Sequence, residues 1–235
     1  EKVNFIKNWI KSYVEKMPNP AKSLVIGVSG GIDSSVSSTL SAMTGLRTIV
    51  LSIPIKQKSS QHDLSLAHQR WLQKNFKNVE IHTIDLDDLF KTFEKSLENF
   101  SNEHGMANSR ARLRMTTLYQ VAAANKGIVV GTGNKVEDFG VGFYTKYGDG
   151  GVDISPIADC NKTEVWELGK ELGILKEIID APPTDGLWDD GRTDEDQLGL
   201  KYNELEEAME NPNSPNRAKY EIIRKQNMHK MEPIP

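Results

Sequence analysis

The sequence predicts an α/β protein built on a doubly wound parallel sheet, flanked by helices and followed by a mainly helical C-terminal part. Between residues 24 and 131, short apolar runs typical of buried strands alternate with segments of helical periodicity. The first run ends in a glycine-rich turn that leads directly into a helix. From Ala181 onward the chain is polar and contains several prolines, with helical segments but no strand-like run. Such alternation is typical of parallel sheets covered on both faces.

Each predicted element follows from a local pattern. Pro18 and Pro20 end a first helix whose apolar residues recur at helical spacing: Phe5, Trp9, Ile10, Tyr13, Val14 and Met17. Strands are predicted at 24–28, 48–53, 79–85 and 127–131. Helices are predicted at 32–43, 61–75, 86–100 and 106–125, with Gly45 as a C-cap and Ser60 as an N-cap. Asn161 and Glu164 open a further helix, and two or three surface helices follow residue 181.

Composition limits the possible classes of function. The 235 residues, 37% of them hydrophobic, suit one globular domain covering 1–235. The formal charge of −4 gives no general attraction for nucleic acid or an anionic membrane, so neither partner is expected. A single cysteine, Cys160, excludes an intramolecular disulfide and is expected to be a packing residue. With no apolar signal core and no run near the roughly 20 residues that span a bilayer, we expect a cytoplasmic protein.

A candidate phosphate loop, Ser29-Gly30-Gly31-Ile32-Asp33-Ser34, follows the first predicted strand and opens the next helix. A helix N-terminus favours an anion through its N–H groups and dipole, and glycines allow a phosphate to approach the backbone closely. The alternative is an ordinary strand-to-helix turn in which Asp33 only faces the helix dipole. Neither the Walker A pattern nor the full Gly-x-Gly-x-x-Gly fingerprint occurs, which disfavours kinase, GTPase and dehydrogenase functions.

The loop resembles the PP-loop of ATP pyrophosphatases, which bind pyrophosphate as a leaving group. Several later segments are similar to signature segments of the NAD synthetase family: 131–137, 143–153, Pro183-Thr184, Asp194-Glu195 and His229-Lys230. The stretch Thr-Lys-Tyr-Gly-Asp-Gly at 145–150 is more specific than the loop. Between Glu137 and Lys146 the chain is one residue longer than in many bacterial relatives, which leaves the local register open.

The resemblance implies a Rossmann-like fold of the adenine nucleotide alpha hydrolase type. It also implies a ligase that amidates deamido-NAD, nicotinic acid adenine dinucleotide, to NAD through an acyl-adenylate, using ATP and ammonia and releasing AMP and pyrophosphate. Two alternatives stay open. One is another PP-loop enzyme, such as a GMP-synthetase-like amidase or a tRNA-thiolating enzyme. The other is a non-catalytic adenine-nucleotide sensor, against which the presence of both Asp33 and Glu137 argues.

Residue roles are carried over from the resemblance. The expected ATP-binding residues are Gly27, Val28, Ser29, Gly30, Gly31, Ile32, Asp33, Ser34, Thr132, Lys162 and Thr184. Asp33 and Glu137 are expected to bind Mg²⁺, since two carboxylates suit a hard cation shared with phosphate oxygens. The expected deamido-NAD contacts are Arg112, Lys146, Asp153, His229 and Lys230. Without the resemblance, Lys162, Arg112 and His229 would each read as an exposed polar residue.

The remaining expectations concern ammonia and assembly. Asp149, with Lys162, is predicted to be catalytic, because a nearby carboxylate would bind ammonium and accept its proton. The glycine-rich stretch 140–151 is expected to be a mobile lid that excludes water.

The family pattern starts within the first thirty residues, so we expect no glutaminase domain and ammonia supplied free or by another protein. A homodimer is implied, with the first helix or the helix at 106–125 as a possible interface. The histidines show no zinc-ligand spacing.

Overall fold

A four-stranded parallel sheet organises the computed structural model, which describes residues 1–186 and 191–235. The strands are β1 (Ser23–Gly27), β2 (Thr48–Ser52), β3 (Val79–Thr83) and β4 (Gly127–Val129). Their order is β3-β2-β1-β4, and all the pairs are parallel. The chain therefore moves outward from β1 in one direction and returns to its other side at β4. In sheets of this kind, ligands bind outside the carboxyl ends of the strands where the order reverses.

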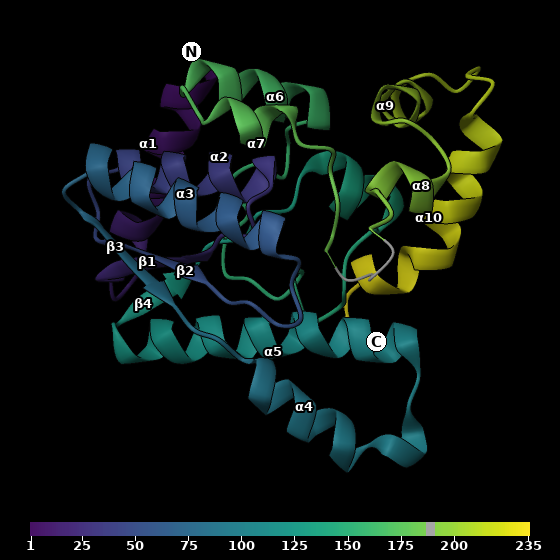
Figure 1. Cartoon of the computed structure of the whole chain (residues 1–235). Coiled ribbons are helices and arrows are strands. Elements are labelled where there is room, and N and C mark those ends of the chain that lie inside the picture. The colour runs from purple at the N-terminus through teal and green to yellow at the C-terminus, as the bar shows by residue number, and fades with distance from the viewer. Residues whose placement is uncertain (187–190) are drawn as a thin grey trace.

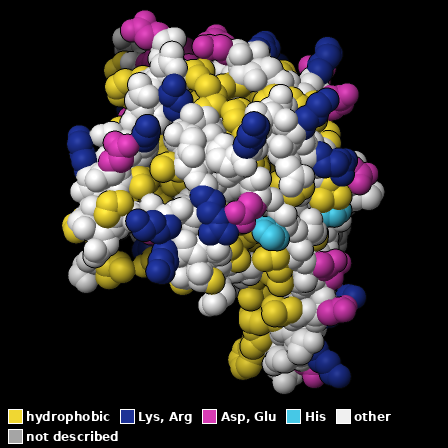
Figure 2. Space-filling model, turned by 90° about the vertical axis from the view of Figure 1, so that its left-hand side faces the viewer, with side chains coloured by type: hydrophobic (Ala, Val, Ile, Leu, Met, Phe, Trp, Pro, Cys, Tyr) yellow, Lys and Arg dark blue, Asp and Glu magenta, His cyan; other side chains and the backbone are white. Residues whose placement is uncertain are grey.

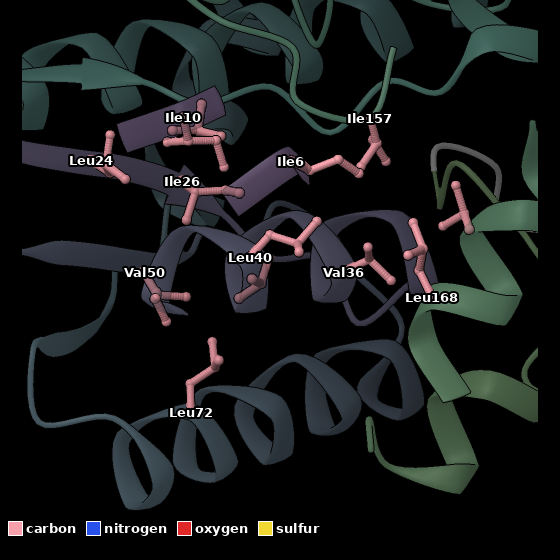
Figure 3. Packing of buried hydrophobic residues seen from close by; sticks show 14 of the residues in the cluster. Ile6, Ile10, Leu24, Ile26, Val36, Leu40, Val50, Leu72, Ile157 and Leu168 are labelled. Carbon is pink, nitrogen blue, oxygen red and sulfur yellow. The ribbon is translucent and has the colours of Figure 1, made fainter. Parts of the chain in front are cut away.

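Helices cover both faces of this sheet, as predicted (Figure 1). One face carries α1 (Lys2–Lys16), α2 (Ile32–Met43) and α3 (Ser59–Asn75), and the long α5 (Glu103–Ala124) lies along the other. Strand residues alternate between the two layers: Leu24, Ile26 and Val50 pack toward α2, whereas Val25, Ile49 and Leu51 pack toward α5. Figure 3 shows the first of these cores, where Val36 and Leu40 of α2 meet the sheet, α1 and α6 (Lys162–Glu171).

The C-terminal part is helical and has a smaller core of its own. It contains α7 (Lys176–Asp180), α8 (Asp194–Leu198), α9 (Tyr202–Glu210) and α10 (Arg217–Met231). A second apolar cluster joins α8, α9 and α10 to the π-helix η2 (Lys135–Val141) through Val136, Val141, Leu198, Leu205 and Tyr220. Because η2 follows β4, this cluster fixes the C-terminal helices against the end of the sheet. Among the described residues, no helix is both long and apolar enough to cross a membrane.

Several predicted boundaries differ from the structure for local reasons. Ser60 is not an N-cap, because α3 already begins at Ser59 after Lys58. The helix expected at 86–100 is interrupted at Leu97, where α4 (Asp87–Ser96) gives way to the 3₁₀ turn η1 (Glu98–Phe100). The long helix starts before residue 106, because the Asn102 Oδ1 accepts a hydrogen bond from the Gly105 N–H at 2.8 Å. Gly45 follows the C-cap Thr44 and has φ +78°, which suits glycine.

The first helix has two apolar stripes rather than one. Val3, Ile6, Ile10 and Val14 are buried against the sheet-side core. Phe5, Trp9 and Tyr13 face outward, and Phe5 is 71% exposed. Sequence periodicity marked the helix correctly, but it did not separate the buried stripe from the exposed one.

A buried histidine connects α3 to α2. His68 is fully buried, its Nε2 lies 2.9 Å from the Ser38 Oγ, and its ring stacks on Trp71. Burial lowers the His68 pKa from 6.5 to about 4, because the apolar surroundings disfavour the charged imidazolium. The folded protein therefore holds this histidine neutral.

We predict that the free energy of unfolding falls as the pH drops from 6.5 toward 4, because the unfolded chain binds the His68 proton more tightly. Between pH 7 and 5 this residue accounts for a loss of about 2 kcal/mol. His68→Gln keeps a polar group near Ser38 but does not titrate, so its stability should change less over this range. Urea unfolding at both pH values measures the difference, and equal pH dependence in the two proteins would contradict the prediction.

Candidate functional site

The predicted phosphate loop lies at the carboxyl end of β1 and opens α2. The Ser29 N–H donates to the Ser34 Oγ at 3.2 Å, and the Ser34 hydroxyl donates to the Gly31 carbonyl oxygen at 3.2 Å. Ser29 is exposed, whereas Ser34 is buried at the start of the helix. The loop therefore has an outer side on which N–H and hydroxyl groups can meet an anion.

Gly30 has the backbone conformation that only glycine adopts easily, with φ +90°. A Cβ atom at this position would lie 2.5 Å from the carbonyl oxygen of Gln61 in α3. The loop is therefore packed directly against α3, and glycine is required by both torsion and space.

A buried ion cluster lies beside the loop. The Lys162 Nζ forms ion pairs with the Asp33 Oδ2 and with the Glu137 Oε1, the latter at 3.0 Å. The Lys162 side chain is only 2% exposed, although it stands in the first turn of α6 where an exposed lysine was the alternative. Lys162, Asp33 and Glu137 thus join α6, α2 and η2 at one point.

Asn134 links the two carboxylate-bearing segments. It is fully buried, its Nδ2 donates to the Asp33 Oδ1 at 3.2 Å, and its Oδ1 accepts from the Glu137 N–H at 3.0 Å. The amide caps η2 and at the same time fixes the Asp33 carboxylate. Asn134 lies within a segment that resembles the family signature, but its structural role was not predicted.

Burial and charge oppose one another in this cluster. Burial alone would lower the pKa of Lys162, but Asp33 and Glu137 raise it, so the ammonium stays charged. Burial also raises the pKa of Asp33. For Glu137, Lys162 and the Tyr202 hydroxyl overcome burial and hold the pKa below its usual range. The cluster therefore contains a permanent cation and at least one permanent anion.

The donor set at this cluster suits a hard cation. Asp33 and Glu137 present carboxylate oxygens, which are the ligands that Mg²⁺ prefers. No group of three or more His, Cys, Asp or Glu side chains among the described residues is arranged to hold a metal ion by itself. Two carboxylates are the usual protein share of a Mg²⁺ that is also bound by substrate phosphates and water.

Four of the residues expected to contact the dinucleotide lie in the loop at 142–151, which follows η2, or form hydrogen bonds at its edge. The Arg112 Nε donates to the Lys146 carbonyl oxygen at 3.1 Å, and the Lys146 Nζ donates to the His229 carbonyl oxygen at 3.1 Å. The Lys230 Nζ donates at 2.9 Å to the carbonyl oxygens of both Gly142 and Tyr144. The loop is therefore tied to α5 on one side and to the end of α10 on the other.

Asp149 lies in the same loop. The residue is exposed, but its carboxyl group lies among protein atoms, and its Oδ1 accepts from the Thr145 N–H at 2.8 Å. Burial of the carboxyl group raises its pKa to about 6, and the charge of Glu137 adds to the shift. Asp138, which was not predicted, lies over Gly133, and burial raises its pKa to about 8. Asp138 and Asp149 thus have raised pKa values and lie within electrostatic reach of Glu137.

The other predicted residues occupy different surroundings. Asp153 lies away from the loop cations: its Oδ2 accepts from the Val129 N–H at 2.7 Å and its Oδ1 from the Tyr119 hydroxyl at 2.9 Å. The Thr184 hydroxyl donates to the Arg192 carbonyl oxygen at 3.2 Å. Gly186, two residues further, packs on the side chain of Gln61, the residue that also meets Gly30. Thr132 lies half-buried just after β4.

Glu137 lies in a π-helix. Residues Lys135–Val141 form η2, which ends at Gly142 with φ +71°. The hydrogen bonds of a π-helix span one more residue than those of an α-helix, and such turns are often found at functional sites. The π-helix holds Glu137 in the ion cluster. The length of this segment relative to bacterial relatives stays a prediction.

Fold and site together define an α/β protein of the nucleotide-binding class, with a candidate phosphate loop and a buried Lys–carboxylate cluster at the switch point, the place where the strand order reverses in the parallel sheet. The family model described as NAD synthase matches residues 2–233. The chain therefore belongs to the NAD synthase family, as its sequence segments predicted.

Individual relatives agree with this assignment. The chain is 37% identical over 209 residues to the NH(3)-dependent NAD(+) synthetase of Mesoplasma florum, covering 88% of this chain and 82% of that protein. A solved structure of NMN synthetase from Francisella tularensis is 34% identical, with a TM-score of 0.90 and coverage of 100% and 96% of the two chains. An NH3-dependent NAD synthetase from Campylobacter jejuni, with nitrate bound, shares the fold at 23% identity and a TM-score of 0.79, covering 100% and 96%.

We predict that Gly30→Ala destabilises the protein by more than about 2 kcal/mol and abolishes binding of an ATP analogue, because strain and overlap with α3 act together. Gly45→Ala is the matched control, since Gly45 also has positive φ but has nothing within 4 Å of the added Cβ. The control should lose about 1 kcal/mol by strain alone and keep nucleotide binding. Denaturant unfolding and calorimetric titration measure both effects, and equal behaviour of the two variants would contradict the prediction.

Proposed function

We propose that this protein catalyses the ATP-dependent amidation of deamido-NAD to NAD with ammonia, through an acyl-adenylate. One observation carries the proposal. The phosphate loop and the Lys162–Asp33–Glu137 cluster lie at the switch point of the sheet, and the loop that carries Lys146 and Asp149 adjoins them. An ATP held at the first group and a carboxylate held at the second would meet between them.

The first step joins the two substrates. The nicotinate carboxylate oxygen attacks the α-phosphorus, the bond from that phosphorus to the β-bridging oxygen breaks, and pyrophosphate leaves with the electron pair. The loop at 29–34 would bind the leaving phosphates through its N–H groups and serine hydroxyls. Lys162, whose ammonium stays charged, would stabilise the negative charge that develops on them.

Magnesium fits the two carboxylates of the cluster. Asp33 and Glu137 would hold it, and the ion would supply neutralisation of phosphate charge when bound. In the present structure the Lys162 Nζ contacts both carboxylates, so the chain itself provides the balancing cation.

The second step needs neutral ammonia, although most of it is ammonium at neutral pH. Asp149 would bind the cation and accept its proton; the raised pKa of about 6 keeps this carboxyl group ionised at neutral pH while making it a better base than an ordinary aspartate. The nitrogen then attacks the acyl carbon, AMP leaves with the electrons of the carbon–oxygen bond, and the second proton that the nitrogen loses passes to water. The glycine-rich loop, held by its contacts with α5 and α10, would cover the adenylate and limit its hydrolysis.

A second candidate acceptor is the mononucleotide, nicotinic acid mononucleotide, whose amidation yields NMN. The specific support is the solved NMN synthetase, which is 34% identical with a TM-score of 0.90, whereas the NAD synthetase structure from Campylobacter jejuni is 23% identical with a TM-score of 0.79. Both acceptors present the same carboxylate to ATP. Deamido-NAD has an additional adenylyl half, which needs further binding surface on the protein.

We predict that the protein with Mg²⁺, ATP and ammonium converts deamido-NAD to NAD with equal amounts of AMP and pyrophosphate. Parallel reactions with nicotinic acid mononucleotide give the ratio of kcat/KM for the two acceptors, and chromatography identifies all products. A higher kcat/KM with the mononucleotide would select the second candidate. Formation of ADP and phosphate in place of AMP and pyrophosphate would reject the mechanism with either acceptor.

The same assay tests Asp149. Asp149→Asn should lower ammonia-dependent turnover at least about 10²-fold, the usual contribution of a general base, while pyrophosphate release from the first step persists. Asp63→Asn, an exposed position on α3, is the control and should behave as the wild type.

A homodimer is part of the proposal. Figure 2 shows apolar side chains gathered along the segment that projects at the bottom, where Figure 1 places α4 and η1. We call this segment, residues 87–100, the arm. On the arm, Leu89 is 50% exposed and Phe100 is 81% exposed. The arm leads into α5, which carries Arg112, so a second copy seated here would lie near the dinucleotide contacts.

We predict that Leu89→Ser with Phe100→Ser converts a dimer into monomers, because the arm would lose the apolar area that drives association. Phe5→Ser on the outward stripe of α1 is the matched control and should leave the dimer intact. Analytical ultracentrifugation measures the masses. Dissociation by the control variant alone would move the interface to α1, one of the two faces considered from the sequence together with the helix at 106–125.

A further inference from the structure

Tyr202, the first residue of α9, reaches the ion cluster from the C-terminal part of the chain. Its hydroxyl lies 2.6 Å from the Glu137 Oε1 and 3.3 Å from the Asp194 Oδ2. The hydroxyl has one proton, and the shorter contact makes Glu137 its acceptor. Nothing in the local sequence marks this tyrosine, and no role was predicted for it.

The tyrosine ring also shapes the surroundings of Lys162. The Lys162 Nζ lies 5.0 Å from the centre of the Tyr202 ring and 5.8 Å from that of Trp166. The two rings meet edge to face at 5.9 Å. The ammonium is therefore held by carboxylates on one side and by aromatic rings on the other. One side chain, Tyr202, touches both the anion and the cation of the cluster.

Tyr202 is itself held rigidly. It is 2% exposed, it packs with Leu205 and Leu198 in the second apolar cluster, and its N–H donates to the Glu195 Oε1 at 3.1 Å. Asp194 stands behind the hydroxyl and is 6% exposed; within the described residues its Oδ1 has no hydrogen-bond partner. A buried carboxyl group is costly unless it is hydrogen-bonded, and the phenol oxygen of Tyr202 lies 3.3 Å from its Oδ2. Because the phenol proton goes to Glu137, a proton on Asp194 would bridge these two oxygens and fix the phenol from behind.

The contacts leave a defined part of Glu137 available. Both Tyr202 and Lys162 contact Oε1, so Oε2 is the oxygen that neither of them occupies. A hydrogen bond that fixes one carboxylate oxygen also fixes the direction of the other. The orientation of Glu137 therefore depends on a residue from α9, far away in the sequence.

We propose that Tyr202 is a positioning residue for Mg²⁺-dependent nucleotide binding: it orients the Glu137 carboxylate and the Lys162 ammonium, and Asp194 acts through the Tyr202 hydroxyl. The inference rests on the proposed function, since it takes Asp33 and Glu137 as the carboxylates that hold Mg²⁺. It makes the C-terminal helices part of the ATP site rather than a separate surface.

The test uses Tyr202→Phe, which removes only the hydroxyl, and calorimetric titration with an ATP analogue that has a methylene group between the α- and β-phosphorus atoms. We expect affinity in the presence of Mg²⁺ to fall about tenfold, the size of a lost hydrogen bond to a charged group. Binding without Mg²⁺ and the KM for the acceptor should stay within about twofold. Tyr220→Phe is the matched control in the same apolar cluster and should bind as the wild type.

Asp194→Ala tests whether Asp194 acts on the cluster through the Tyr202 hydroxyl or independently of it. It should weaken Mg²⁺-dependent binding in the same direction, and the double variant Tyr202→Phe with Asp194→Ala should be no weaker than the worse single variant, because both act through one hydroxyl. Additive losses would overturn the relayed role of Asp194. Unchanged Mg²⁺-dependent binding by Tyr202→Phe, in a protein whose wild type binds the analogue, would overturn the positioning role alone. A wild type that fails to bind the analogue would overturn the proposed function and this inference together.

Discussion

The structure depends on one buried ion cluster, in which the Lys162 ammonium pairs with the carboxylates of Asp33 and Glu137. The Lys162 side chain is 2% exposed, and without these partners its burial would strongly lower the stability of the fold, because its charge is removed from water. The three residues come from α6, α2 and η2, which are distant in the sequence but must meet for the charge to be balanced. Removing Lys162 would leave both carboxylates without their buried cation, whereas removing one carboxylate would leave the ammonium with a single anionic partner. The cluster therefore ties the halves of the molecule together at the place where nucleotide chemistry is proposed.

Two further layers surround this cluster. Asn134 joins Asp33 to the backbone of Glu137, and Tyr202 joins Glu137 to the C-terminal helices. On the other side, Lys230 and Lys146 hold the glycine-rich loop against α10. The polar contacts that build the site are therefore the same contacts that fix the C-terminal part on the sheet. A single change there is expected to affect binding and stability together, which is why matched conservative variants are needed to separate the two.

Much of the fold was predictable because its signals are local. The apolar run at 24–28 followed by two glycines indicated a strand, a turn and a helix, and β1, the loop and α2 confirm this. Boundaries were less predictable. The Asn102 cap starts α5 before residue 106, and Leu97 has non-helical torsions between α4 and η1. Neither feature stands out in the sequence as the apolar pattern does. The outward stripe of α1 was indistinguishable from its buried stripe, since both have helical spacing.

The sequence by itself determined the alternation of strands and helices, the need for glycine in the candidate phosphate loop and the family to which the chain belongs. Each of these depends on residues that are close together in the sequence. Motif resemblance also selected Asp33, Glu137 and Lys162 before their contacts were known. Only the tertiary structure decided that Lys162 is buried, that Asp153 is engaged by Tyr119 and the β4 backbone, and that Tyr202 touches Glu137. These facts depend on side chains brought together from distant segments by packing, and contacts of that kind leave no periodicity or spacing along the chain.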